Sequence, residues 1–232
     1  MKKKNLLLML LAVMALLLIP VSVQAAAAKP GTVKLSSVKV VDYNKINVKW
    51  KKTSGATNYI VYYKKAGSGK WVKVKTLDSK KSSYTHTSSS KYPIVVGKKY
   101  QYTVKAYNKK TRKSGRYNTK GLTVTASLKM VTGIEAKIEG TTVKLTWNKV
   151  SGADKYAIYS KIKADDKWSK IITVKDTSSF VDVNPCINCT NYYSVRGYSS
   201  GTKAYGVMNK TGVSIYVKDS DEVRPTITPE PT

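Results

Sequence analysis

Two cysteines, Cys186 and Cys189, stand three positions apart and are the residues best suited to chemistry. A Cys-x-x-Cys pair can act as a redox centre where a helix N-terminus stabilises the thiolate. Here Pro185 precedes the pair and a predicted β-strand follows it, which argues against that chemistry. A zinc site would need two further ligands, and His86, the only histidine, lies in another part of the chain. We therefore expect an intraloop disulfide, which the oxidising surroundings of an exported protein would permit.

The other ionisable residues give no support to an enzyme. His86 has no nearby cysteine or carboxylate in sequence, and we expect it on the surface of a strand. Asp42 and Asp78 are the only acids over residues 31–127, so paired-carboxylate hydrolysis has no basis there. Nucleophile-elbow, P-loop and EF-hand motifs are all missing from the sequence. The sequence predicts a protein that is not an enzyme and needs no cofactor or metal ion.

A long repeat provides the elements that must position these residues. The stretch from Trp50 to Thr76 recurs without a gap, 97 residues later, from Trp147 to Thr173. Repeat units of solenoids and propellers are about 20–50 residues long, so this longer period indicates tandem domains. The following residues of the first copy recur in the second: Trp50, Ser54, Gly55, Ala56, Tyr59, Tyr62, Lys64, Trp71 and Thr76.

Both copies have the pattern of β-strands. Ile46, Val48 and Trp50 alternate with polar residues, and the second copy repeats this alternation, which is typical of half-buried strands. Gly55 stands in a predicted turn, and the segment 67–69 is expected to close a hairpin. Tryptophans at the ends of such strands favour core packing over sugar binding.

Three motifs recur in both copies: a Trp that ends the second strand, Ser-Gly-Ala before a Tyr-rich strand, and a late strand at 100–107 or 191–198. Their combination resembles the fibronectin type III domain, in the version common in exported bacterial proteins. The resemblance covers residues 33–127 and 129–218 and implies an all-β chain of two tandem immunoglobulin-like β-sandwiches. Tyr100 takes the place of the family's tyrosine corner, which bonds upstream backbone. The second copy has Asn191 there, so its corner bond stays open.

We divide the chain into four segments: a signal peptide (1–25), two domains (31–127 and 128–218) and a Pro/Thr-rich tail (219–232). The apolar run 6–19 is shorter than the about 20 residues that cross a bilayer, which favours cleavage over anchoring. No later run could span a membrane. We expect a secreted protein, either extracellular or at the cell surface.

The charge is uneven between the two copies. The whole chain carries a formal +29; residues 31–127 hold 23 Lys and Arg against two acids (+21), and residues 128–220 hold 14 against eight (+6). Such an excess attracts polyanions, so anionic cell-envelope or extracellular polymers are the expected partners, with another surface protein as an alternative. A solubilising surface is the competing interpretation. Lysine supplies point charges rather than bidentate recognition, and a specific nucleic-acid ligand is not expected.

The residues that we expect at a binding surface surround the second tryptophan of each copy. They are Trp71, Trp168, Lys64, Lys65, Lys70 and Lys73. Each indole could instead pack partly buried against its sheet. The sequence predicts a non-catalytic adhesion or spacer protein; a carbohydrate- or envelope-binding accessory module and a fragment of a larger secreted hydrolase are the alternatives.

Overall fold

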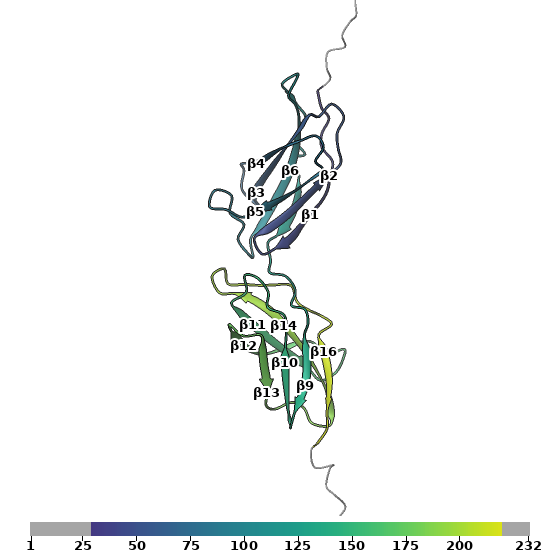
Figure 1. Cartoon of the computed structure of the whole chain (residues 1–232), viewed down its shortest axis with the longest axis vertical. Coiled ribbons are helices and arrows are strands. Elements are labelled where there is room, and N and C mark those ends of the chain that lie inside the picture. Colours follow the sequence, from purple (N-terminus) through teal and green to yellow (C-terminus); the bar gives the residue numbers. More distant parts are fainter. Residues whose placement is uncertain (1–28, 220–232) are drawn as a thin grey trace, which may run out of the picture.

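The computed structural model describes residues 29–219, in which all regular secondary structure is β-strand (Figure 1). No helix in this part of the chain could cross a membrane. The expected signal peptide (1–25) and all but the first residue of the expected tail (219–232) lie outside the described residues. The all-β prediction is confirmed.

In the first sandwich a three-stranded sheet packs against a larger sheet, and the strands pair antiparallel. The smaller sheet has the order β1-β2-β5, and its strands are β1 (Leu35–Asp42), β2 (Lys45–Trp50) and β5 (Ser83–Thr87). The larger sheet has the order β4-β3-β6, with β7 and β8 both paired to β6. Its strands are β3 (Asn58–Lys65), β4 (Val72–Asp78), β6 (Lys99–Asn108), β7 (Lys113–Ser114) and β8 (Leu122–Thr125).

The second sandwich repeats this topology. Its smaller sheet has the order β13-β10-β9, and its larger sheet has the order β12-β11-β14 with β15 and β16 paired to β14. The strands are β9 (Glu135–Glu139), β10 (Thr142–Thr146), β11 (Lys155–Lys161), β12 (Ser169–Lys175), β13 (Ser179–Asp182), β14 (Cys189–Ser199), β15 (Ala204–Tyr205) and β16 (Val213–Val217). The hairpin expected at 67–69 joins β3 to β4.

The two cores contain equivalent tryptophans, as the repeat predicts. Trp50 and Trp147 are 3% and 5% exposed. Each ring packs against a tyrosine of the next strand, with ring centroids 5.5 Å apart for Trp50–Tyr59 and 5.4 Å apart for Trp147–Tyr156. The two tyrosine hydroxyls also accept equivalent backbone N–H groups, at 2.7 Å from Thr53 and 2.8 Å from Val150. Residues that lie 97 positions apart in the sequence therefore also occupy equivalent places in the two cores.

The prediction for His86 was wrong, because the side chain is only 1% exposed. Residues of β5 alternate between the two faces of the sheet, and His86 shares the inward face with Tyr84. Its Nδ1 lies 2.8 Å from the hydroxyl of Tyr102, and its Nε2 lies 3.2 Å from the carbonyl oxygen of Tyr92. Burial lowers the pKa of His86. The single histidine is a hydrogen-bonded core residue.

The second domain places a carboxylate where the first has His86. Asp182 pairs across the sheet with Val143, as His86 pairs with Ile46. Its Oδ2 accepts the hydroxyl proton of Tyr193 at 2.7 Å. This tyrosine follows Asp182 by 11 residues, whereas Tyr102 follows His86 by 16. The loop between these strands is therefore five residues longer in the first domain.

The two sandwiches lie end to end along the longest axis of the molecule (Figure 1). The connecting segment is held to the second domain, because the N–H of Val207 donates to the carbonyl of Leu128 at 3.3 Å. Across the junction, the Tyr43 ring lies against Gly152, where an ideal Cβ would be 2.6 Å from Cγ of the tyrosine. Gly152 also has a φ of +82°, which disfavours other residues. Glycine is required at this contact on both grounds.

Candidate functional site

The tryptophans expected at a binding surface occupy equivalent half-buried positions. Nζ of Lys64 lies 4.8 Å from the ring centroid of Trp71, and Nζ of Lys161 lies 4.8 Å from that of Trp168. An ammonium at this distance from an indole is attracted by the negative charge on the ring face. In both domains the lysine comes from the end of one strand and the indole from just before the next.

A tight turn supports the far edge of each indole. An ideal Cβ on Gly121 would lie 3.0 Å from Cη2 of Trp71, and one on Gly212 would lie 2.8 Å from Cη2 of Trp168. Both glycines have positive φ, +58° and +63°. Since a lysine and a glycine turn contact both rings in the same way, the indoles pack onto the outer face of the larger sheet as structural elements.

Most of the expected lysines surround a cavity in the first domain. It has a volume of about 220 Å³ and lies between the β3–β4 hairpin and the loop that precedes β6. Its cationic lining consists of Lys64, Lys65, Lys70 and Lys98. The structure thus brings three of the four expected lysines together and adds Lys98, which sequence reasoning missed. Lys73 points from β4 without lining the cavity, and neither Trp71 nor Trp168 lines it.

A tyrosine corner fixes the loop that carries Lys98. The hydroxyl of Tyr100 accepts the N–H of Val95 at 2.8 Å, as the resemblance implied. On the opposite side, the N–H of Ala66 in the hairpin donates to the carbonyl of Lys99 at 2.8 Å. Both walls are therefore hydrogen-bonded to β6 or its first residues, and the cavity is preformed by backbone geometry. The corner would have located Lys98 from sequence, because Lys98 lies within the segment that it closes.

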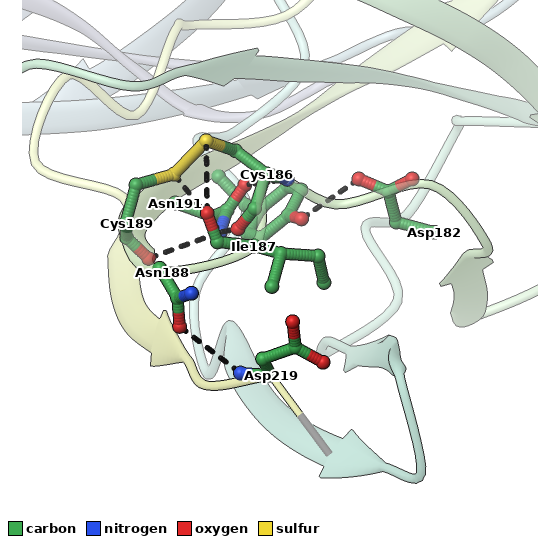
Figure 2. Close-up of a disulfide and its surroundings, with 8 residues drawn as sticks. Asp182, Cys186, Ile187, Asn188, Cys189, Asn191 and Asp219 are labelled. Carbon is green, nitrogen blue, oxygen red and sulfur yellow. Dashed lines mark hydrogen bonds between the residues drawn. A yellow bond between two sulfur atoms is a disulfide. The ribbon is translucent and has the colours of Figure 1, made fainter. Parts of the chain in front are cut away.

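The strand pairing aligns Cys189 with Lys98, so the corresponding location in the second domain holds the disulfide. Figure 2 shows this disulfide and its surroundings. Cys186 and Cys189 are joined, as predicted, with Cα atoms 5.8 Å apart. Asn191 replaces the corner tyrosine: its Oδ1 accepts the N–H of Cys186 at 2.9 Å and its Nδ2 donates to the carbonyl of Cys186 at 2.8 Å. Asn188 also accepts the N–H of Asp219 at 3.0 Å. The cysteines thus close a loop, and within residues 29–219 no cluster of His, Cys, Asp or Glu could hold a metal ion.

Comparison with known proteins identifies the fold. No protein-family model matches the chain, and no curated protein matches its sequence. Among solved structures, the chicken interferon gamma receptor alpha chain is similar over 84% of this chain and 100% of its own, with 14% identity and a TM-score of 0.53. Each sandwich has the fibronectin type III fold.

Two further structures are similar at lower scores. A two-domain fibronectin type III segment of chicken tenascin matches with 12% identity and a TM-score of 0.48, over 81% of this chain and 97% of its own. The FN1–FN3 domains of chicken CNTN1 match with 20% identity and a TM-score of 0.36, over 83% and 67%.

The charges of the first fibronectin type III domain are not neutralised within it. Its two acids cap turns: Asp42 accepts the N–H of Tyr43 at 2.9 Å and Asp78 accepts the N–H of Lys80 at 2.8 Å. Ion pairs between described residues, Lys144–Glu139 and Lys175–Asp176, both lie in the second domain. The lysine ammoniums of the first domain thus have no carboxylate partners in the described part of the chain.

A second aromatic and cationic group lies on the outer face of the first fibronectin type III domain. The rings of Tyr62 and Tyr117 meet edge to face with centroids 5.1 Å apart, and Nζ of Lys105 lies 4.7 Å from the Tyr117 centroid. Burial and a hydrogen bond with Tyr117 raise the pKa of Tyr62 to about 12. In the second domain, Arg196 stacks on Tyr205 at 4.9 Å. Sequence reasoning missed both groups, because Tyr117 lies in the connection between β7 and β8 and Tyr205 lies on the two-residue strand β15.

Proposed function

We propose that this is a secreted, non-catalytic adhesion or spacer protein whose first fibronectin type III domain associates with anionic polymers at a cell surface or in the extracellular space. The tandem fold supports a non-catalytic module of this kind, and the Cys186–Cys189 disulfide fits an extracellular location. The single observation that carries the polymer assignment is the charge of the first domain, 23 cationic residues against two acids, with no intradomain ion pair among its described residues.

This charge distribution favours association with polyanions. Self-repulsion of like charges destabilises a compact domain, and a polyanion relieves that repulsion when it binds. The attraction is long-ranged at low salt and is screened beyond about 8–10 Å at physiological ionic strength. Lysine ammoniums are hydrated point charges, which favours contact with many anionic groups over recognition of one planar group. The second domain carries much less excess charge and serves as the spacer.

The half-buried tryptophans give less support to a sugar-stacking module. Trp71 and Trp168 have the same lysine and glycine neighbours in both domains, so a role in packing explains both. The fragment of a larger hydrolase, kept open by the sequence, is favoured by no described residue.

Charge reversal in the mature chain tests the proposal. One variant changes four exposed lysines of the first domain to Glu, and its matched control changes four of the second: Lys39, Lys75, Lys80 and Lys109 against Lys137, Lys163, Lys170 and Lys210. Retention on immobilised teichoic acid and heparin is then measured across a salt gradient. We expect wild type and control to elute at similar salt and the first-domain variant to elute far earlier. Equal shifts for the two variants, or salt-insensitive retention, would contradict the proposal and leave a solubilising surface.

A further inference from the structure

We infer that the lysine-lined cavity of the first domain is a binding site for an acidic sugar unit, a six-membered ring carrying a carboxylate or phosphate, within an anionic polysaccharide. This inference rests on the proposed function and makes it specific: general attraction brings the polymer to the domain, and the cavity holds one of its residues.

The cavity combines cationic and apolar side chains in the way such a unit requires. Besides the four lysines, its lining includes Val72 and Val95, which are 43% and 37% exposed. Exposed apolar side chains beside ammoniums are costly to hydrate and gain from covering by the apolar faces of a sugar ring. Meanwhile the ammoniums supply charge-assisted hydrogen bonds to an acidic substituent.

Packed aromatic rings lie at the base of the cavity. Tyr63 lines it and is 7% exposed. Behind it, the His86 ring meets the Tyr63 ring edge to face with centroids 4.8 Å apart, and the Tyr100 ring stacks beside it at 6.1 Å. A preformed aromatic base reduces the entropy lost when a ligand binds.

The volume suits one residue of a polymer rather than a large ligand. Pockets for drug-sized molecules have volumes of about 300–1,000 Å³, and this cavity has about 220 Å³. A polymer that fills it with one ring would lay its neighbouring units over the surrounding lysines.

The second domain keeps lysines at two of the four positions, Lys161 and Lys167, but lacks the other two, and it is an internal control. The gapless repeat puts Ile162 at the position of Lys65 and Asp165 at that of Ser68. The strand pairing and the shorter loop put Cys189 at the position of Lys98, in the disulfide. An acidic sugar therefore meets fewer ammoniums and an added carboxylate there.

Two matched triple variants of the full mature chain separate the contribution of the cavity lysines to affinity from that of the domain's overall charge. The first removes cavity lysines (Lys65→Ser, Lys70→Ser, Lys98→Ser), and the second removes the same charge elsewhere in the domain (Lys39→Ser, Lys75→Ser, Lys109→Ser). Affinity for oligogalacturonate is measured by titration calorimetry at low and physiological salt. We expect the cavity triple to lose at least tenfold in affinity and the control triple less than threefold, with melting temperatures confirming that both fold.

A third variant, Val72→Ser with Val95→Ser, tests whether binding depends on apolar contact with the sugar ring as well as on charge. We expect it to weaken oligogalacturonate binding at least threefold and to leave inorganic polyphosphate binding unchanged. A short oligosaccharide of phosphorylated hexoses distinguishes phosphate-bearing from carboxylate-bearing polymers, and tight binding of either acidic saccharide supports the inference.

Other outcomes overturn the inference and separate it from the proposed function. Equal losses for the two lysine triples would remove the cavity site and leave the general polyanion function intact. Two results together would overturn the sugar assignment. They are an unchanged oligogalacturonate affinity in the Val72→Ser, Val95→Ser variant, and competition by polyphosphate as strong as that by oligogalacturonate at matched charge. No loss in either triple would sink both the inference and the proposed function.

Discussion

Asn191 binds both the N–H and the carbonyl of Cys186, five residues upstream, at 2.9 and 2.8 Å. Tyr100 binds the N–H of Val95, also five residues upstream, at 2.8 Å. A carboxamide and a phenol therefore have the same role in the two domains, because each forms hydrogen bonds with the backbone of the loop before the central strand. The carboxamide carries its acceptor and its donor on two separate atoms, which lets it bind the N–H and the carbonyl of one residue in the shorter loop.

Replacement of Asn191 should lower the free energy of unfolding of the second domain more than replacement of an exposed asparagine does. Asn191→Ala leaves the two backbone groups of Cys186 without these partners, at a cost of about 1–3 kcal/mol in the free energy of unfolding. Urea unfolding, monitored by tryptophan fluorescence, measures the loss. The exposed Asn184→Ala is the control and should be neutral; an equally small effect at Asn191 would show that water replaces the bonds freely.

Acid should destabilise the first domain through His86. Burial lowers its folded pKa, so between that value and about 6.5 the unfolded chain binds the proton that the folded chain excludes. The contribution of neutral His86 to the free energy of unfolding is therefore fully present above about pH 6.5. It falls as the pH decreases, by up to about 1.4 kcal/mol per pH unit. Melting curves from pH 7.5 to 4.5 check this. His86→Phe should flatten the dependence, and a variant as pH-sensitive as the wild type would refute the assignment to this residue.

The disulfide should stabilise the second domain modestly. Closing a loop of about four residues restricts the unfolded chain by about 2 kcal/mol in the chain-entropy description, and the Asn191 bonds still hold the loop when the sulfurs are removed. We expect Cys186→Ser with Cys189→Ser to lower only the second domain's unfolding transition. Mass measurement after alkylation of the unreduced wild type should find no free thiol. Labelling of both cysteines would contradict the bond itself.

Gly121 and Gly212 should resist substitution. An ideal Cβ would lie 2.4 Å from the carbonyl oxygen of Tyr102 in the first case and 2.2 Å from that of Tyr193 in the second. Each Gly→Ala change should cost more than about 1 kcal/mol, since it adds a clash to an unfavourable φ, and should shift the emission of the adjacent indole. Gly69, in open space, is the control; its replacement by Ala should change neither stability nor emission.

The sequence predicted the fold and the core well because both copies share the residues that define them. Trp50 and Trp147 alternate with polar neighbours, and that alternation alone places them inside. The sequence misplaces His86 because a histidine is usually polar and exposed, although the alternation of β5 puts it on the same inward face as Tyr84. Lys98 was missed for a different reason: its side chain reaches the cavity only through a loop conformation set by the Val95–Tyr100 bond. Alternation of residues does not encode such a loop.

The contact of Tyr43 with Gly152 makes the joint between the domains unique within the repeat. The position of Tyr43 in the second copy is occupied by Gly140, which has open space around it. The position of Gly152 in the first copy is occupied by Gly55, whose carbonyl accepts the Asn108 side chain at 2.8 Å. Duplication thus copied the fold but not the coupling. The second domain has Gly140 where the first has the ring of Tyr43, so this contact is particular to the joint between these two domains.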